Sequence, residues 1–324
     1  MQKTIAIIGC GRIANFAHLP ALSQMEDVRI KYACDLLIEK ANAVVEKFGA
    51  EQAITDYKIA LADPEVETVF VLTPNYALSK EMADEAEKQG KLLNIGVCNR
   101  FQESVCRIAE MNKRGELGNI YHVYCSFRAH RSIPGLGGSF TNKAESGGGV
   151  LIDWGVHYLD LILYILGGAE LKSVSANTYC EMAKDMKAYK YTGMWAEETK
   201  RIEDGVNDVD DFVTGFIRTN KASISFNGAW AQNIAKRDTY IDFLGDKGGV
   251  RLDYCGHFTF FKDDLTEERP EFDIPDMYYR EDSDFLDACE TGRRNRSHIS
   301  EILESAKLLD AIYQSADEKR EITF

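Results

Sequence analysis

The feature that most constrains this chain is its first fourteen residues, where a β-branched run leads directly into a glycine turn. Residues 4–8 read Thr-Ile-Ala-Ile-Ile, and residues 9–14 read Gly-Cys-Gly-Arg-Ile-Ala. This order predicts a buried strand, a tight turn at Gly9, and a helix that packs closely on the strand because Ala14 is small. Gly11 lets the backbone approach a pyrophosphate, whose charge the helix N-terminus attracts. The segment favours dinucleotide binding.

An acidic residue at the end of the next strand-like run supports this interpretation. Residues 28–34 form the run, and Asp35 follows it, twenty-four residues past Gly11. A carboxylate there accepts hydrogen bonds from ribose hydroxyls and repels the 2′-phosphate of NADP. We therefore predict NAD, bound by Gly9, Gly11, Arg12, Ile13 and Asp35. The alternative is a glycine turn in an ordinary α/β domain, with Asp35 capping the next helix.

Composition narrows the class of protein. The 324 residues carry a net charge of −14, which argues against nucleic acid and anionic membranes as partners. Eight cysteines without a C-x-x-C pair indicate reduced thiols, and six histidines without a second pair at ligand spacing predict no metal site. The longest apolar stretch, residues 150–166, contains three ionisable side chains, so we expect no membrane span. With no signal peptide before the first strand, we expect a cytoplasmic protein.

The pattern of predicted elements divides the chain at residue 97. Residues 1–97 alternate strand and helix, which predicts a Rossmann-type, doubly wound parallel sheet with residues 92–97 as its last strand. Residues 98–324 predict an α+β domain with an open, mainly antiparallel sheet. Its expected strands are 119–128, 171–182, 209–218, 222–230, 238–244, 249–254 and 257–262, and its expected helices are 103–114, 281–292 and 299–315.

The strongest signal in the second half is the segment 147–160, which reads Gly-Gly-Gly-Val-Leu-Ile-Asp-Trp-Gly-Val-His-Tyr-Leu-Asp. A helix that starts near Asp153 places Asp153, His157 and Asp160 on one face. A histidine beside a carboxylate transfers protons near neutral pH. The alternative is that Asp153 caps the helix and His157 is a buried structural histidine.

Five motifs in this order resemble the glucose–fructose oxidoreductase / inositol dehydrogenase / MocA family over essentially the whole chain. They are the turn at 9–14, Thr73-Pro74-Asn75, Asn99-Arg100-Phe101, residues 115–118 and residues 147–160. The resemblance implies hydride transfer between a nicotinamide cofactor and a sugar, cyclitol or related polyol. It implies that Asp153 and His157 are catalytic and that Thr73, Pro74 and Asn75 lie beside the nicotinamide. It also implies an open sheet that forms the oligomer interface. We expect a homodimer or homotetramer, because the strands between 209 and 262 carry large apolar residues on both alternations: Phe212, Phe216, Phe226 and Trp230 on one, Val213 and Ile217 on the other.

One departure from the family pattern is clear. The family carries a Glu-Lys-Pro motif whose lysine helps bind the reacting hydroxyl, and this chain has none. Between Asn75 and residue 92 it has room for one helix where the family has about one further helix–strand unit. Lys80 and Lys91 are candidate substitutes, although both are better explained as solvated lysines at helix ends.

The resemblance also suggests substrate contacts. A glycine-rich basic loop follows the run 119–128 and lies near the active-site mouth in the family's architecture, so Arg128, His130 and Arg131 are candidates together with Arg100. The alternative is a structural loop with surface arginines. Trp230 is a candidate for stacking on a sugar ring, with packing as the alternative.

Three functions remain open from the sequence. The first is an NAD-dependent oxidoreductase of a sugar or cyclitol hydroxyl. The second is a catalytically impaired dinucleotide-binding protein that acts as a sensor or assembly partner. The third is an enzyme that cleaves glycosides through transient use of bound NAD. The Asp153/His157 pair favours the first function, and the missing lysine favours the second.

Overall fold

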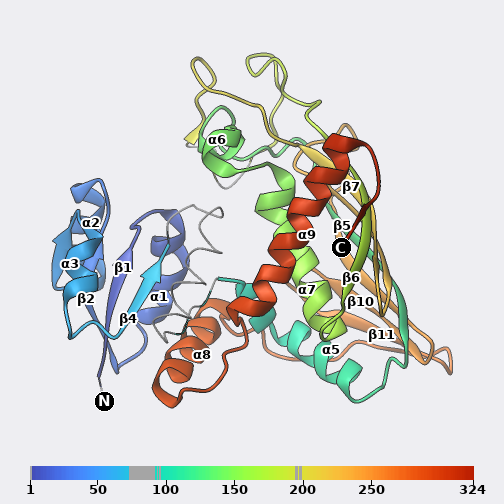
Figure 1. The fold of residues 1–324 in the computed structure, drawn as a ribbon, viewed down its shortest axis with the longest axis horizontal. Helices are drawn as coiled ribbons and strands as arrows, with labels where there is room; N and C mark the ends of the chain where they lie inside the picture. The colour runs from blue at the N-terminus through green and yellow to red at the C-terminus, as the bar shows by residue number, and fades with distance from the viewer. Residues whose placement is uncertain (1, 73–91, 93, 95, 194–195, 197–198) are drawn as a thin grey trace. The chain divides into compact units, whose positions relative to one another are not determined.

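The structure is a computed structural model that describes residues 2–72, 92, 94, 96–193, 196 and 199–324. The chain forms two compact units (Figure 1). The first contains the described residues of Met1–Asn75, Glu85–Phe101 and Pro275–His298, and the second contains those of Gln102–Ile274 and Ile299–Phe324.

The first unit is built on a parallel sheet of four described strands in the order β3-β2-β1-β4. The strands are β1 (Lys3–Ile8), β2 (Val28–Cys34), β3 (Gln52–Ile54) and β4 (Thr68–Val71). The helices are η1 (Ala14–His18), α1 (Leu19–Leu22), α2 (Ile38–Phe48), α3 (Tyr57–Ala62), η2 (Cys98–Phe101) and α8 (Met277–Thr291). β1 lies between two neighbours and has no accessible surface at Ile5, Ala6 and Ile7, which explains its continuous apolar run.

Two expectations about the first unit need correction. The described residues of 92–97 belong to no strand of the sheet; Asn94 forms only an isolated antiparallel bridge with His298. The main-chain N–H of Val97 donates to Glu281 Oε1 at 2.8 Å. The contacts found for Asn94 and Val97 are thus an isolated bridge and a side-chain hydrogen bond, both with residues 281–298.

The boundary expected at residue 97 is not enough to divide the chain into its two units. Pro275–His298 belongs to the first unit, although we assigned everything after 97 to the second. The reason is apolar burial: Phe285 and Leu286 of α8 join the core formed by β1 and α1, and the ring of Phe285 meets that of Phe70 edge-on at 5.9 Å.

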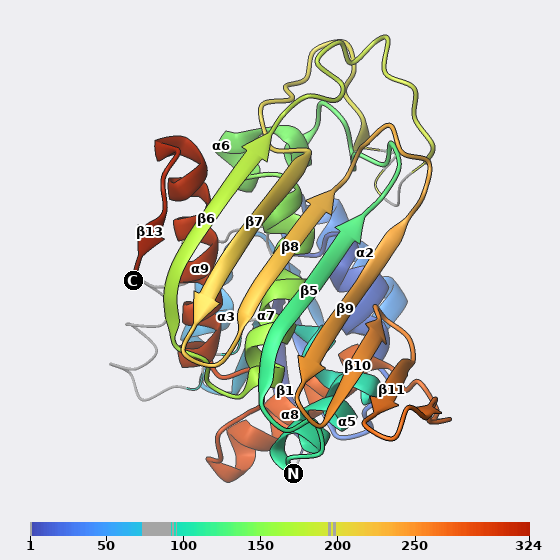
Figure 2. The same cartoon turned by 90° about the vertical axis from the view of Figure 1, so that its right-hand side faces the viewer.

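The second unit is built on a nine-stranded sheet that Figure 2 shows face-on. The order is β12-β11-β10-β9-β5-β8-β7-β6-β13, and every neighbouring pair is antiparallel except β5–β8. The strands are β5 (Ile120–Arg128), β6 (Leu171–Tyr179), β7 (Phe212–Thr219), β8 (Ser223–Ala229), β9 (Asp238–Gly245), β10 (Gly248–Asp253), β11 (Phe258–Lys262), β12 (Glu267–Glu268) and β13 (Ile322–Thr323). The mainly antiparallel sheet matches the prediction.

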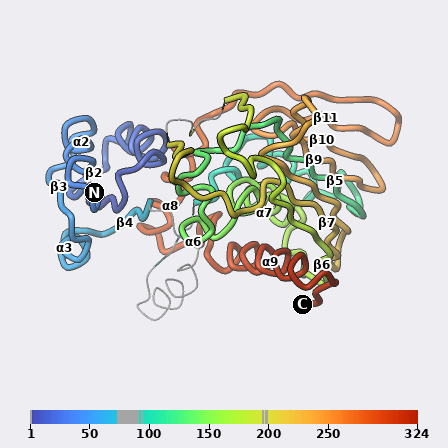
Figure 3. The backbone as a smooth tube through the Cα atoms, turned by 90° about the horizontal axis from the view of Figure 1, so that it is seen from above, coloured from blue at the N-terminus to red at the C-terminus, as the bar shows by residue number. Residues whose placement is uncertain are grey.

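Helices cover one face of this sheet. The covering helices are α5 (Glu103–Lys113), α7 (Val156–Leu166), which η4 (Leu151–Gly155) precedes, and α9 (Ile299–Glu318). Two short helices, η3 (Ser139–Thr141) and α6 (Lys143–Ser146), precede η4 in the chain. α7 packs against β5, α5 and α9, and Figure 3 shows α9 running along the same side of the sheet. Within the described residues, one segment, Lys143–Leu166, has the length and mean hydropathy (1.5) of a membrane span, and 67% of its most apolar window is buried inside the protein. Its apolar character is explained by packing in the core.

The apolar residues of β7 and β8 divide between the two faces differently from our expectation. We grouped Phe226 and Trp230 with Phe212 and Phe216. Gly215 of β7 pairs with Phe226, however, which places Phe226 on the buried face with Val213. Residue parity predicts a shared face only within one strand, because the pairing register relates one strand to the next.

Candidate functional site

The glycine turn after β1 has the backbone conformation that the sequence predicts. Gly9 has φ +96°, in the region that favours glycine, and its N–H donates to Cys34 O at 2.8 Å. A Cβ added at Gly11 would meet nothing within 4 Å, so the turn is open where a pyrophosphate approaches. The helix begins at once, at Arg12, and Ile13 is 42% exposed.

The carboxylate of Asp35 lies directly against this turn. Its Oδ2 accepts from the N–H of Cys10 at 2.9 Å, and its Oδ1 accepts from the N–H of Leu37 at 3.0 Å. An ionised carboxylate has further lone pairs, so both oxygens remain able to accept from ribose hydroxyls. The open turn and the adjacent carboxylate fit NAD. Thr73, Pro74 and Asn75, predicted to lie beside the nicotinamide, fall outside the described residues.

The predicted catalytic pair lies where a π-turn joins an α-helix in the second unit. Asp153 belongs to the π-turn η4, and His157 is the second residue of α7. Single π-turns inside helices are frequent at functional sites because they locally widen the helix. Gly155 leaves room for the side chain of Leu151, whose Cδ1 lies 2.8 Å from the position of a Cβ added at this glycine.

Asp153 is half-buried, and among the described residues its side chain bonds to Trp230. The indole N–H of Trp230 donates to Asp153 Oδ2 at 3.0 Å. Burial raises the pKa of Asp153 to about 7, and the indole hydrogen bond opposes that rise. The side chain of Trp230 has no accessible surface, so it does not stack on a sugar as we considered. It orients the aspartate.

His157 is also half-buried and lies in surroundings that favour the neutral imidazole. Burial lowers its pKa, and the charge of Asp160 acts in the opposite direction. Its Nδ1 is buried without a hydrogen-bond partner among the described residues. Asp160 accepts from Ser305 Oγ at 2.8 Å and is fully buried, so it takes part in core packing. This part of the helix thus carries, four residues apart, a carboxyl group whose pKa burial raises to about 7 and an imidazole whose pKa burial lowers.

The four predicted substrate contacts are divided between the two units: Arg100 belongs to the first, and Arg128, His130 and Arg131 belong to the second. Arg100 is 1% exposed, belongs to the first unit and donates from Nη1 to Arg296 O at 3.0 Å. Arg128 forms an ion pair with Asp238 on the neighbouring strand β9. These contacts favour structural roles for both arginines.

The other two candidates, His130 and Arg131, lie in the loop that follows β5. The carbonyl of His130 accepts from Ser132 Oγ at 3.0 Å. Arg131 donates to Asn233 Oδ1, and its guanidinium lies 5.8 Å from the centre of the Tyr189 ring. A role of either residue in binding substrate stays a prediction.

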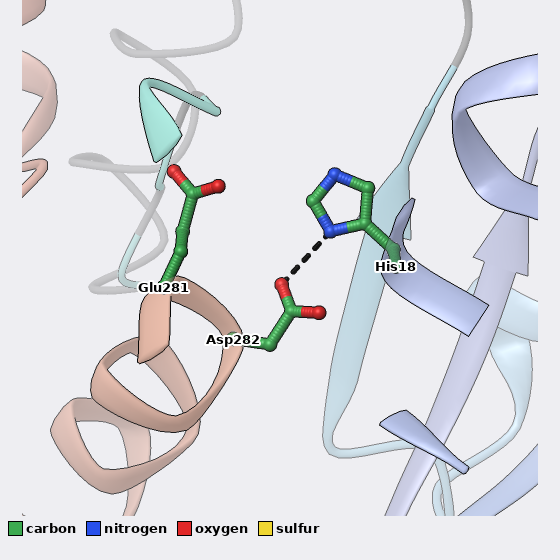
Figure 4. A group of neighbouring side chains, drawn as sticks. All are labelled: His18, Glu281 and Asp282. Atoms are coloured by element: carbon green, nitrogen blue, oxygen red, sulfur yellow. Dashed lines mark hydrogen bonds and ion pairs between the residues drawn. The ribbon is translucent and has the colours of Figure 1, made fainter. Parts of the chain in front are cut away.

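A buried group of ionisable side chains in the first unit was not anticipated. His18, Glu281 and Asp282 bring their donor atoms within 4.8 Å of one another, as no other such group does in the described part of the chain (Figure 4). His18 Nδ1 contacts Asp282 Oδ1 at 2.9 Å. Burial disfavours the imidazolium, but the hydrogen bond and charge of Asp282 outweigh it and raise the pKa of His18. The pair fastens α8 to the helix that follows the glycine turn, and the absence of a metal site stays a prediction.

All eight cysteines are free, in agreement with the sequence analysis. Cys10, Cys34 and Cys125 are buried in or beside strands. Burial raises the pKa of the Cys10 thiol to about 12, so this thiol beside the glycine turn is inert at neutral pH.

Comparisons with known proteins agree with this architecture. Residues 3–97 match an oxidoreductase family with an NAD-binding Rossmann fold, and residues 105–251 match the GFO/IDH/MocA C-terminal domain. D-glucoside 3-dehydrogenase of Escherichia coli is 30% identical over 274 residues, covering 76% of each chain. Myo-inositol 2-dehydrogenase of Thermotoga maritima is 24% identical over 53% of this chain and 57% of its own.

Solved structures show the same fold over the whole chain. A levoglucosan dehydrogenase in complex with NADH and levoglucosan superposes with a TM-score of 0.82 at 19% identity, covering 100% of this chain and 99% of that one. An aldose–aldose oxidoreductase from Caulobacter crescentus gives 0.81 at 20% identity, with both chains fully covered. The matched domains account for most of the chain, which belongs to the GFO/IDH/MocA family of NAD-binding oxidoreductases.

Proposed function

We propose that this protein transfers a hydride between NAD and a hydroxyl or carbonyl of a sugar, a glucoside or a cyclitol. The observation that carries the proposal is the half-buried pair in the second unit: an imidazole that burial keeps neutral, four residues after a carboxyl group with a pKa of about 7. Two relatives are named as dehydrogenases of a D-glucoside and of myo-inositol, and these names support the substrate class.

The first unit supplies the residues that would hold the cofactor. The turn at Gly9 and Gly11 receives the pyrophosphate, and Asp35 receives the adenosine ribose. Bound NAD supplies the hydride acceptor, and the protein supplies binding and orientation.

The second unit supplies the proton chemistry. His157, neutral at physiological pH, takes the proton that the substrate hydroxyl loses as its carbon becomes a carbonyl. Asp153, held by the Trp230 indole, accepts a hydrogen bond from a neighbouring substrate hydroxyl and balances charge that develops on the imidazole. In the reverse direction the same histidine returns the proton to the forming alkoxide.

The experiment measures NAD reduction against a panel of glucosides, free sugars and inositols, with the His157→Asn protein alongside. Turnover on at least one panel member that falls by about 10² or more in the variant supports the proposal. NAD binding without turnover on the whole panel in either direction would favour the second candidate, a binding protein. The observation behind that candidate is the absent Glu-Lys-Pro lysine.

We also propose that the protein works as a homodimer or homotetramer in the cytoplasm. The sheet face opposite the helices carries aromatic side chains on neighbouring strands, including Tyr124 at 48% and Tyr179 at 43% exposure, with Phe212 and Phe216 half-buried beside them. Burying such a face against a second copy removes apolar surface from water. Light scattering that gives the monomer mass at micromolar concentration contradicts the oligomer.

A further inference from the structure

The three-glycine run before the catalytic helix is shaped around one buried residue, Asp210, which precedes β7. Asp210 is 6% exposed and lies about sixty residues beyond the glycine run in sequence. Its Oδ1 accepts from the N–H of Gly149 at 2.8 Å, and its Oδ2 accepts from the N–H of Leu151 at 3.0 Å. Its main-chain carbonyl accepts from the N–H of Val150 at 2.8 Å.

Three consecutive N–H groups at the start of this helix therefore donate to a single residue, Asp210. The first N–H groups of a helix have no partner within it, and they are usually satisfied by a neighbouring capping side chain. Here no local side chain caps η4. Asp210 performs the role from a distant segment, and its carboxylate also complements the positive end of the helix dipole.

The glycines make this contact possible. A Cβ at Gly149 would lie 1.9 Å from Asp210 O, and a Cβ at Gly148 would lie 2.1 Å from Tyr313 Oη. Tyr313 of α9 in turn donates its hydroxyl to Asp210 Oδ1 at 2.6 Å. Glycines at 148 and 149 thus leave room for a cap that is itself held in place by α9.

The cap is connected directly to the catalytic pair. The N–H of Gly149 donates to Asp210, and the carbonyl of Gly149 accepts from the N–H of Asp153 at 3.0 Å. Leu151, the other residue bound by the carboxylate, accepts the N–H of Val156, which precedes His157. Each of these two hydrogen bonds joins a residue that Asp210 binds to the backbone near the pair. One reaches Asp153 itself, and the other reaches Val156, the residue before His157.

From this geometry we infer that Asp210 is a positioning residue for the Asp153–His157 pair, with Tyr313 as its support. The inference rests on the proposed function, because it assigns Asp210 to the reaction that those two residues carry out. A displaced catalytic group loses rate steeply, and a misplacement of about 1 Å costs up to 10²-fold.

The neighbouring Asp211 offers a matched control. It is equally buried, at 2% exposure, and its Oδ2 accepts from the N–H of Met182 instead of from the helix. Asp211→Asn therefore replaces one buried carboxyl group without touching the helix. Comparing Asp210→Asn with Asp211→Asn separates a loss of general stability from a loss of catalytic alignment.

The first measurement needs no substrate: the NMR titration of ¹⁵N-labelled histidine, with the His157 signals identified by their loss in His157→Asn. We expect Asp210→Asn, and more weakly Tyr313→Phe, to move the chemical shifts and titration midpoint of His157. Asp211→Asn should leave both unchanged. NADH affinity should be equal in all variants, since the glycine turn belongs to the first unit.

The second measurement is turnover on the best substrate of the panel. Asp210→Asn should lower kcat by about ten- to a hundredfold with little change in the KM for NAD. Equal His157 titrations in folded Asp210→Asn and Asp211→Asn overturn the inference. If Asp210→Asn does not fold, unchanged His157 signals in Tyr313→Phe overturn it. Absence of turnover on the whole panel refutes the proposed function instead, and the titrations, which need no substrate, still decide whether Asp210 positions the imidazole.

Discussion

The two halves of the functional machinery both rest on a helix with a π-turn in its first turns, yet they are held in different ways. After Gly9 and Gly11 the π-turn η1 follows, and the turn is fixed by the neighbouring strand β2 and the residue after it, Cys34 and Asp35. The helix of Asp153 and His157 is fixed by Asp210, Tyr313 and Trp230, which come from distant segments. The cofactor turn is thus a local motif, whereas the proposed catalytic helix depends on tertiary packing.

The largest expected effect tests the catalytic half. His157→Asn should lower kcat by about 10²–10⁴-fold, because the hydroxyl proton then has no acceptor, and NAD binding should stay nearly unchanged. Steady-state kinetics and calorimetry measure the two quantities. His257→Asn, a change at an exposed histidine of the same unit, serves as the control. A near-normal kcat would leave His157 a structural histidine.

The next effect concerns the lysine that the chain lacks. Inserting a helix–strand segment with Glu-Lys-Pro after Asn75 should raise kcat/KM by about 10²–10³-fold, the usual value of one charge-stabilising group. The control insertion carries Glu-Met-Pro. If the parent already turns over at ordinary dehydrogenase rates, the prediction is wrong, and Lys80, which lies outside the described residues, is the first position to mutate.

A smaller effect tests the cofactor half. Asp35→Ala should weaken NADH binding by about ten- to a hundredfold, the value of one or two hydrogen bonds to a charged group, and should narrow the preference for NADH over NADPH. Fluorescence titration measures both affinities. Asp56→Ala removes a carboxylate that caps α3 in the same unit and should leave both affinities unchanged. Equal losses in the two variants would mean that Asp35 is only a cap.

The smallest effect is a shift in pH dependence. The indole N–H of Trp230 stabilises the charged form of Asp153, so Trp230→Phe should raise the Asp153 pKa above its value of about 7. If the ionised carboxylate is the active form, the acidic limb of the kcat/KM profile moves to higher pH. Trp230→His, which retains a ring N–H, should restore part of the shift. A profile that does not move would mean that the ionisation of Asp153 does not determine the acidic limb.

The comparison also explains which features the sequence predicts. The strand, turn and acidic residue of the cofactor half lie within thirty-five residues and follow from local rules, and the structure places Asp35 at the turn as expected. The partners of the catalytic helix could not be derived in this way. Trp230 and Asp210 reach it only through the sheet register and the path of the chain, neither of which a single sequence displays.

The errors have the same origin. The segment 92–97 reads as a strand, but the partners of Asn94 and of the Val97 N–H, both described, are His298 and Glu281, nearly two hundred positions away. Phe226 shares the parity of Phe216, but strand pairing turns it to the opposite face. In each case the local sequence pattern was described correctly, but a distant part of the chain determined which residues surround it.

The return of Pro275–His298 to the first unit has a consequence for how the protein is made. The buried pair His18–Asp282 and the packing of Phe285 complete the nucleotide-binding core only with residues from near the end of the chain. During synthesis, which proceeds from the N-terminus, the first domain to begin folding is therefore among the last to finish. A fragment that stops at residue 97 would expose the apolar surface that α8 covers, so the cofactor domain cannot be isolated by a single cut.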